Sequence, residues 1–308
     1  MVWKPMEPPP DITGHGWYVG TSGYYFEDWV GLFNPPRPSG RRRAALSEEA
    51  RADHDRLRFY QKYFSFVEIN QTFYREPVIE TFLEIERRSK ETMRYAVKAH
   101  RDISHTKAWD AEVGKEMMRR HVAAVAPLVE TGRFYSFLIQ LEDHVYRDQR
   151  RLDYLLAVAS EAVRRRIDVH IEFRHNSWHA KHPLQALMDS GIGICNTEIP
   201  PIDHAFPLKA YATTDRGYVR YSGCNLRNWY PQERQTTYRD RIAARNSRYD
   251  YLYSEEELMA RVKGQRILSE KVGVVAVAFN NHYSAQAVIN AIRNIRLLRE
   301  CLAAGAWL

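Results

Sequence analysis

The chain has 308 residues, of which 44% are hydrophobic, 27% charged and 12% aromatic, and its 45 basic residues outnumber 38 acidic ones to give a net charge of +7. This composition excludes collagen-like, low-complexity and acidic disordered chains. Arginine accounts for 35 of the basic residues, and guanidinium groups bind carboxylates and phosphates in a bidentate manner. The excess therefore favours an anionic partner, unless it reflects only the base composition of the genome.

Three further absences narrow the class of protein. The longest apolar runs, 122–129 and 272–279, are shorter than the ~18 residues of a membrane helix, so we expect no membrane partner. Residues 1–10 lack the pattern of a signal peptide. The three cysteines are too far apart for a disulfide framework or a zinc knuckle, so we expect a reduced, cytoplasmic protein. We expect no cofactor and assign no residues to a metal site, and whether the reaction needs a metal is left open. The oligomeric state is left open.

Eight short apolar runs alternate with segments of helical periodicity. We predict strands at 17–21, 66–70, 94–99, 134–141, 168–173, 191–196, 218–222 and 272–280, and helices at 48–63, 79–89, 111–129, 150–165 and 183–189. Such alternation is typical of a parallel sheet. The predicted fold class is α/β, a (β/α)₈ TIM barrel forming a single domain over 1–308, with a core at about 16–302 and an N-terminal extension at 1–15. No Gly-x-Gly-x-x-Gly motif supports the rival, an open doubly wound sheet.

Two connections are longer than a minimal barrel needs, and they predict enlarged loops after strands 1 and 7. The first, 34–45, contains three prolines and an arginine triplet at 41–43. The second, 223–253, contains six arginines, three acidic residues and six tyrosine or tryptophan side chains. Long loops in compact domains are usually functional. We expect the second loop to cover the barrel mouth, although packing on the outer helices is the alternative.

Side-chain alternation along the strands predicts which residues point into the barrel. In the fifth strand Val169, Ile171 and Phe173 fall on one face, and His170, Glu172 and Arg174 on the other. The same reasoning gives a set of inward polar residues at the carboxyl ends of the other strands, where barrel enzymes build active sites. Apart from those already named, these are Glu68, Asn70, Lys98, His100, Gln140, Arg220, Asn280 and His282.

The charges in this set suit an anionic ligand. Lys98, Arg174 and Arg220 exceed Glu68 and Glu172 by one. The two glutamates would supply a general acid and a general base, or else serve only as ion-pair partners of the cations. Lys98 would clamp an anion, or would act as a Schiff-base nucleophile if a neighbouring cation lowered its pKa. His100 and His282 would assist, and Asn70, Gln140 and Asn280 would orient the ligand.

Several of these strand ends carry motifs that resemble the YecE-like family, a domain of unknown function (number 72). The matching stretches include Val67-Glu-Ile-Asn70 with Thr72-Phe-Tyr74, Ala96-Val-Lys-Ala-His-Arg101, Ile171-Glu-Phe-Arg-His175 and Phe279-Asn-Asn-His-Tyr283 with Gln286. The resemblance implies a TIM barrel over nearly the whole chain but no particular reaction. Within these motifs Tyr74, Arg101, His175, Asn281 and Gln286 become further candidates for substrate binding.

We therefore expect an enzyme that acts on an anionic, phosphate-bearing substrate, which would be a nucleotide, a nucleic acid or a sugar phosphate. A hydrolase or a lyase fits the residue set best. One alternative is a non-catalytic nucleic-acid-binding protein that uses the Arg/Tyr-rich loop 223–253. A second is a glycosidase that uses Glu68 and Glu172 as its two carboxylates.

Overall fold

The computed structural model describes residues 4–36, 54–230, 237 and 246–304. Eight parallel strands pair in sequence order, and β8 pairs with β1 to close the barrel. The strands are β1 (Trp17–Ser22), β2 (Phe66–Ile69), β3 (Arg94–Lys98), β4 (Phe134–Gln140), β5 (Val169–Glu172), β6 (Gly193–Glu198), β7 (Arg216–Tyr221) and β8 (Val274–Phe279). Each overlaps a strand expected from the sequence, so the predicted (β/α)₈ barrel is confirmed.

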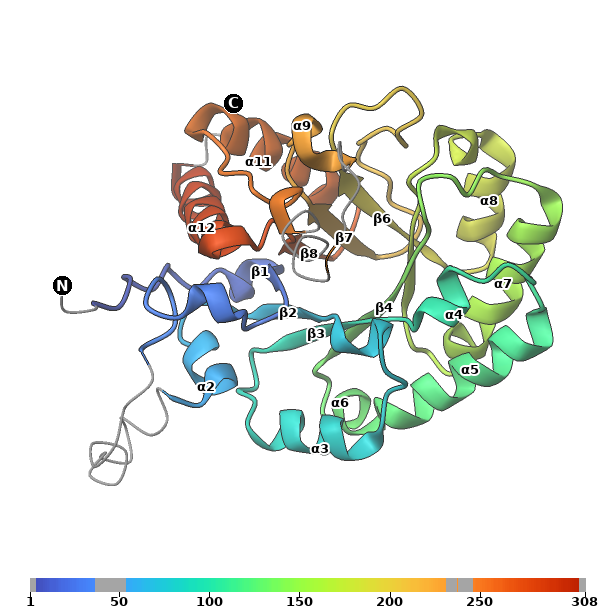
Figure 1. The fold of residues 1–308 in the computed structure, drawn as a ribbon, viewed down its shortest axis with the longest axis horizontal. Coiled ribbons are helices and arrows are strands. Elements are labelled where there is room, and N and C mark those ends of the chain that lie inside the picture. The colour runs from blue at the N-terminus through green and yellow to red at the C-terminus, as the bar shows by residue number, and fades with distance from the viewer. Residues whose placement is uncertain (1–3, 37–53, 231–236, 238–245, 305–308) are drawn as a thin grey trace.

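Helices surround the barrel on its outside (Figure 1). They are α2 (Arg56–Tyr60), α3 (Ile79–Arg87), α4 (Arg101–Ser104), α5 (Ala111–Ala124), α6 (Ala126–Glu130), α7 (Gln149–Val163), α8 (Lys181–Asp189), α9 (Leu226–Trp229), α11 (Glu255–Ser269) and α12 (Gln286–Ala304). The short 3₁₀ helices are η1 (Thr13–His15), η2 (Glu27–Trp29), η4 (Gln71–Phe73), η5 (Asn176–Trp178) and η6 (Tyr283–Ala285).

Two helix predictions differ from the structure. The helix expected over 111–129 is two helices, because Pro127 lacks the N–H that would continue the first one. In the region of the helix expected over 48–63 the structure shows only α2, and residues 37–53 lie outside the described part. Residues 199–215, between β6 and β7, form no helix at all. The barrel therefore departs from a regular repeat of eight strand–helix units.

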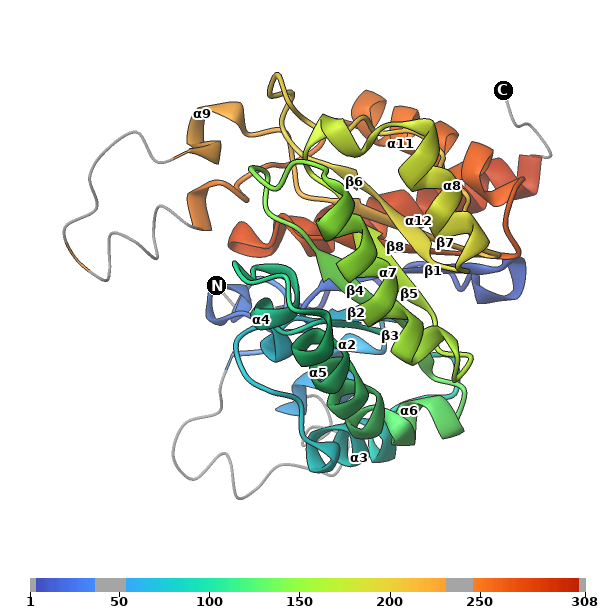
Figure 2. The ribbon, with the colours of Figure 1, turned by 90° about the vertical axis from the view of Figure 1, so that its right-hand side faces the viewer.

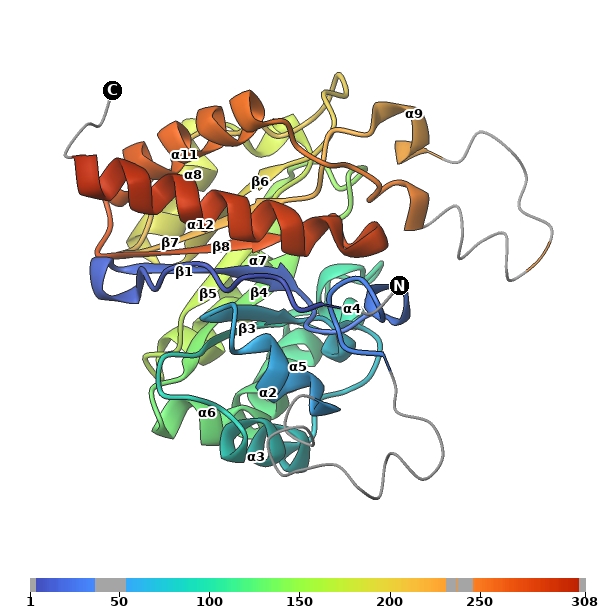
Figure 3. The same ribbon diagram turned by 90° about the vertical axis from the view of Figure 1, so that its left-hand side faces the viewer.

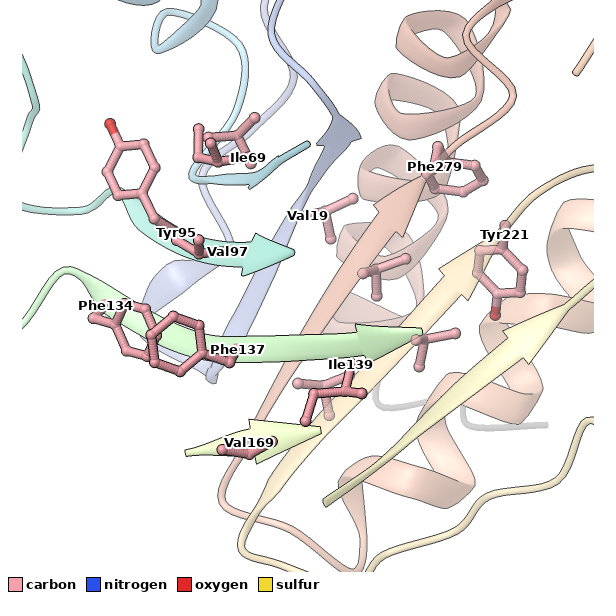
Figure 4. Packing of buried hydrophobic residues seen from close by; sticks show 14 of the residues in the cluster. Val19, Ile69, Tyr95, Val97, Phe134, Phe137, Ile139, Val169, Tyr221 and Phe279 are labelled. Atoms are coloured by element: carbon pink, nitrogen blue, oxygen red, sulfur yellow. The ribbon is translucent and has the colours of Figure 1, made fainter. Parts of the chain in front are cut away.

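The main hydrophobic core lies between the strands and the surrounding helices. Figure 4 shows Val97, Phe137, Ile139 and Val169 on this outward side of the strands, and each of them is buried. A second, smaller cluster fills the inside of the barrel and includes Phe66, Tyr135, Leu138 and Tyr218. The alternation predicted for the fifth strand is present, because Val169 and Ile171 belong to the outer core. This arrangement leaves the inward positions at the carboxyl ends of the strands for polar side chains.

Candidate active site

Six predicted site residues from five strands or strand ends lie together at the carboxyl end of the barrel. We call them the charged network: Glu68, Lys98, Gln140, Glu172, Arg174 and Arg220. Each of these side chains is 9% exposed or less. Because burying a charge is costly unless it is paired, the hydrogen bonds among them determine what the site can do.

Arg220 lies at the centre of the charged network. Its Nε and Nη2 donate to Oε2 and Oε1 of Glu68 at 2.9 and 3.0 Å, which is a bidentate ion pair. Its Nη1 donates to Oε2 of Glu172 at 3.1 Å and to Oε1 of Gln140 at 3.3 Å. A single guanidinium therefore joins the second, fourth and fifth strands across the barrel.

The two glutamates have further partners. Nε of Arg174 donates to Oε1 of Glu172 at 2.9 Å, and the hydroxyl of Tyr218 donates to Oε2 of Glu68 at 2.5 Å. Nζ of Lys98 donates to Oε1 of Gln140 at 2.9 Å. Every carboxylate oxygen of Glu68 and Glu172 is thus already hydrogen-bonded, three of the four to arginine and the fourth to arginine and tyrosine together.

These contacts set the protonation states of the buried groups. Burial works against an ionised Glu68, but the charge and hydrogen bonds of Arg220 outweigh it and lower the pKa of this carboxyl. Burial raises the pKa of the Tyr218 phenol well above its ordinary value, so the phenol remains a hydrogen-bond donor. A glutamate held as the anion is a poor general acid. The arrangement therefore favours the ion-pair interpretation of Glu68 over the two-carboxylate glycosidase.

Lys98 differs from the arginines of the charged network. Burial, followed by the positive charge of Arg220, lowers the pKa of its amine to about 7. Its Nζ lies 4.0 Å from the centre of the Phe73 ring. The hydroxyl of Thr72 donates to the Lys98 carbonyl at 2.6 Å, which fixes the η4 turn and its phenylalanine against β3.

Three other predicted residues lie at the same end of the barrel without joining the charged network. Asn70 lines a cavity of about 310 Å³ together with Glu68, Tyr25 and Arg56, and its buried Oδ1 accepts no hydrogen bond from the described residues. The imidazole of His282 stacks on Phe26 at 4.2 Å. Nδ2 of Asn280 donates to the Ser222 hydroxyl at 3.3 Å.

Four predicted residues lie apart from the charged network. His100 caps α4, where its Nδ1 accepts from the backbone N–H of Asp102 at 3.3 Å. His175 caps η5 in the same way. Tyr74 is 58% exposed, and the exposed side chain of Arg101 pairs with the neighbouring Asp102 at 3.9 Å. In this structure these four residues cap helices or face solvent.

The remaining two candidates hold a neighbouring segment of the chain. Nδ2 of Asn281 donates to the Tyr251 carbonyl, and Nε2 of Gln286 donates to Oδ1 of Asp250. Just before α12, the N–H of Ser284 donates to Oδ2 of Asp28 at 2.7 Å.

The described parts of the long seventh loop lie over the end of the barrel. Figures 2 and 3 show α9 at the end toward which the strands point. The buried ring of Trp229 lies 5.7 Å from the guanidinium of Arg174, and the Tyr230 hydroxyl donates to Oδ2 of Asp143 at 2.7 Å. The loop arginines at 234, 239, 241 and 245 lie outside the described residues.

Several residues at this end were not singled out by sequence reasoning. Tyr218 and Phe73 contact the charged network, and Tyr25 and Arg56 line the cavity beside it. Tyr218 could have been found, because it shares the inward face of β7 with Arg220. Phe73 and Tyr25 lie in turns after strand ends and Arg56 begins α2, and strand alternation gives no side-chain direction in such places.

The described residues also bear on metal binding and membrane insertion. Among them, no group of three or more His, Cys, Asp or Glu side chains is arranged to hold a metal ion. No helix in the described ranges is both long and apolar enough to span a membrane. All three cysteines are free thiols.

The fold and the charged end of the barrel define a TIM-barrel protein with a candidate active site of ion-paired arginines and glutamates. A model of the family described as "Protein of unknown function DUF72" matches residues 18–305. The chain therefore belongs to the DUF72 family, and the resemblance inferred from its motifs is confirmed.

Known relatives agree with this assignment. The chain is 21% identical over 289 residues to UPF0759 protein YunF of Bacillus subtilis, covering 91% of this chain and 94% of that protein. It is similar to the crystal structure of a DUF72 family protein from Thermotoga maritima, with 29% identity, a TM-score of 0.76 and coverage of 92% and 100% of the two chains. A DUF72 family protein from Enterococcus faecalis shares the fold at 21% identity, with a TM-score of 0.74 and coverage of 92% and 95%.

Proposed function

We propose that the protein is a cytoplasmic enzyme that acts on a small anionic, phosphate-bearing substrate at the carboxyl end of the barrel, by hydrolysis or by a lyase reaction. The observation that carries the proposal is the hydrogen bonding of Arg174. Its Nε is held by Glu172, whereas its two terminal nitrogens donate to no described residue. A guanidinium that is fixed at one edge and open at the other is ready to bind a phosphate or carboxylate.

Arg220 has a different role in this proposal. Its guanidinium is 2% exposed and already donates to Glu68, Glu172 and Gln140. It therefore orients both glutamates and contributes positive potential, whereas Arg174 contacts the anion. Glu172 bridges the two arginines and is a positioning residue.

The depth of these cations favours a small ligand over a nucleic acid. Lys98, Arg174 and Arg220 are 9%, 8% and 2% exposed, so a phosphate bound to them must enter the barrel end. A polynucleotide backbone binds best to exposed basic side chains, which exchange counterions with its phosphates. We therefore favour a phosphorylated metabolite over nucleic-acid binding without catalysis.

The first test is stabilisation by anions. Sulfate and phosphate should raise the melting temperature of the wild-type protein more than chloride does at matched ionic strength. A ligand that binds only the folded state adds about 2.7 kcal/mol at roughly a hundred times its Kd. Arg174→Met should abolish this extra stabilisation. Arg216→Met is the matched control, because Arg216 pairs with Asp168, the residue before β5, and is partly exposed.

An equal response of all three proteins to sulfate would overturn the anion site at Arg174. A screen of phosphate esters, nucleic acids and glycosides, with and without divalent metal ions, then tests the reaction itself. Turnover of a phosphorylated compound that is lost in Arg174→Met and kept in Arg216→Met supports the proposal. Turnover of neutral glycosides alone would favour the two-carboxylate glycosidase.

A further inference from the structure

We infer that Lys98 is an amine nucleophile that forms an imine with the carbonyl group of the anionic substrate. The inference rests on the proposed anion site and narrows its substrate to a carbonyl compound that carries a phosphate or carboxylate. It also favours a lyase over a hydrolase, because an iminium group accepts the electron pair of a breaking carbon–carbon bond.

The inference rests on which cations the carboxylate oxygens of the charged network are paired with. Arg220 takes both oxygens of Glu68 and one oxygen of Glu172, and Arg174 takes the other. Lys98 consequently has no ion pair with a described residue, although two carboxylates lie in the same cluster. Its one hydrogen-bond acceptor there is the neutral Gln140 amide, and a phenylalanine ring lies against its amine.

An exposed lysine of the same chain shows the contrast. Nζ of Lys115 donates to Oε1 of Glu112 at 2.6 Å, as expected for an ordinary charged amine on a helix surface. Lys98 lacks such a counter-ion and is almost fully buried. The Phe73 ring and the two carboxylates of the cluster favour the ammonium form, but burial and the neighbouring arginines outweigh them, so the amine is available for nucleophilic attack.

Some of the charged groups around Lys98 lower the pKa of its amine and others raise it. Burial and the guanidinium groups of Arg220 and Arg174 lower the pKa of the amine, while the carboxylates of Glu68 and Glu172 raise it, and the net result is about 7. His105, which packs edge-on against Phe73, is neutral near pH 7, because burial and then Lys98 lower its pKa to about 4. A large fraction of Lys98 is therefore unprotonated near neutral pH, roughly a thousandfold more than for an ordinary lysine.

The proposed step is balanced without any further reagent. The Nζ lone pair attacks the carbonyl carbon, the oxygen takes up a proton and a carbinolamine forms. Loss of the hydroxyl group as water, with a second proton, gives the imine, so that one amine and one carbonyl yield one imine and one water. The terminal nitrogens of Arg174 would hold the anionic group while this happens.

Reductive trapping tests the inference directly. Pyridoxal 5′-phosphate combines an aldehyde with a phosphate, and borohydride converts its imine into a stable secondary amine. We expect peptide mass spectrometry to find Lys98 as the first lysine modified at neutral pH. Inorganic phosphate should compete with the labelling, and unphosphorylated pyridoxal should label Lys98 at least about tenfold more slowly, the effect of roughly 1.4 kcal/mol of phosphate binding.

Two variants complete the experiment. Lys98→Arg keeps a cation but cannot form an imine, so labelling at this position should vanish, whereas Lys115→Arg should be labelled at Lys98 as wild type is. If Lys98→Arg does not fold, the site of modification in the wild-type protein still decides the question. Random modification of exposed lysines, with Lys98 untouched, would overturn the inference. Sulfate stabilisation that persists in that case would leave the anion site standing.

Discussion

The buried polar side chains at the two ends of the barrel interior have different hydrogen-bond partners: backbone carbonyls at one end and other charged side chains at the other. Toward the amino ends of the strands, the Tyr135 hydroxyl donates to the Gly217 carbonyl at 2.6 Å, and Nε2 of His170 donates to the Arg216 carbonyl at 2.9 Å. At the carboxyl ends, Glu68, Glu172 and the arginines satisfy one another. Neutral side chains bonded to backbone cost little to bury, whereas a group of ion-paired charges is expensive to bury. This difference is expected if the charged end forms the proposed anion site at a cost in stability.

The largest test of this contrast removes one arginine from each end of the same strand. Arg220→Leu leaves Glu68 and Glu172 without their shared partner, and we expect it to destabilise the protein by about 3–5 kcal/mol. Arg216→Leu breaks a partly exposed ion pair with Asp168, and we expect a loss of about 0–1 kcal/mol. Urea denaturation of both variants measures the difference. Equal losses of stability would show that the buried charged network contributes no more to the free energy of unfolding than an exposed ion pair does.

The next largest expected effect on stability comes from the amine of Lys98, and it depends on pH. Its pKa is about 7 in the folded protein, whereas an ordinary lysine has a pKa of 10.5, so the unfolded chain binds more protons between these values. The penalty for burying Lys98 is therefore full below about pH 7 and disappears as the pH rises toward 10.5. Lys98→Met should consequently gain more stability, or lose less, near pH 6.5 than near pH 9.5.

Urea denaturation at both values of pH checks this prediction for Lys98. Lys115→Met serves as the control, because Lys115 is already paired on the surface. A Lys98→Met effect that is the same at both values would mean that the amine is charged throughout.

At the opposite end of the barrel, His170 should make the stability of the protein depend on pH in the acidic range. Burial lowers its pKa below the ordinary value of 6.5, so the unfolded chain binds the additional proton as the pH falls through that value. The wild-type protein should therefore lose stability below about pH 6.5, and His170→Gln should show a shallower loss. Thermal unfolding between about pH 4.5 and 8 measures both slopes. Identical slopes would exclude His170 as a source of acid sensitivity.

The smallest expected effect on stability concerns the α9 region, which lies over the charged end of the barrel. Tyr230→Phe removes the hydrogen bond to Asp143 between two partly exposed groups, so stability should change by no more than about 0.5 kcal/mol. Labelling of Lys98 should nevertheless become faster, because the α9 region is no longer joined to the loop after β4. Tyr146→Phe, at another exposed tyrosine, is the control. An unchanged rate of labelling would show that the hydrogen bond between Tyr230 and Asp143 does not control access to Lys98.

Sequence reasoning succeeded where side-chain direction follows from strand periodicity. Alternation in β5 and β7 placed Glu172 and Arg220 inside the barrel, and the structure brings both into one network. It failed beyond the strand ends, where backbone direction depends on turns that sequence does not specify. His100 continues the inward parity of the third strand in sequence, yet its side chain turns to cap the short helix α4.

The pairing of charges also could not be read from the sequence. The sequence left open which cation each glutamate would pair with, and in the structure the bidentate geometry of Arg220 takes both oxygens of Glu68. Which cation lacks a counter-ion depends on distances between strands that are far apart in sequence. The structure alone identifies Lys98 as that cation.

The contact between Arg220 and Glu68 joins residues that are 152 positions apart, and the barrel itself is closed by its first and last strands. While only β1 to β6 have been synthesised, the barrel cannot close and Glu68 lacks the arginine that pairs with it. Folding can be completed only after β7 and β8 have emerged, since contacts over such separations form late and slowly. The order of synthesis thus delays the burial of Glu68 until its counter-ion is present.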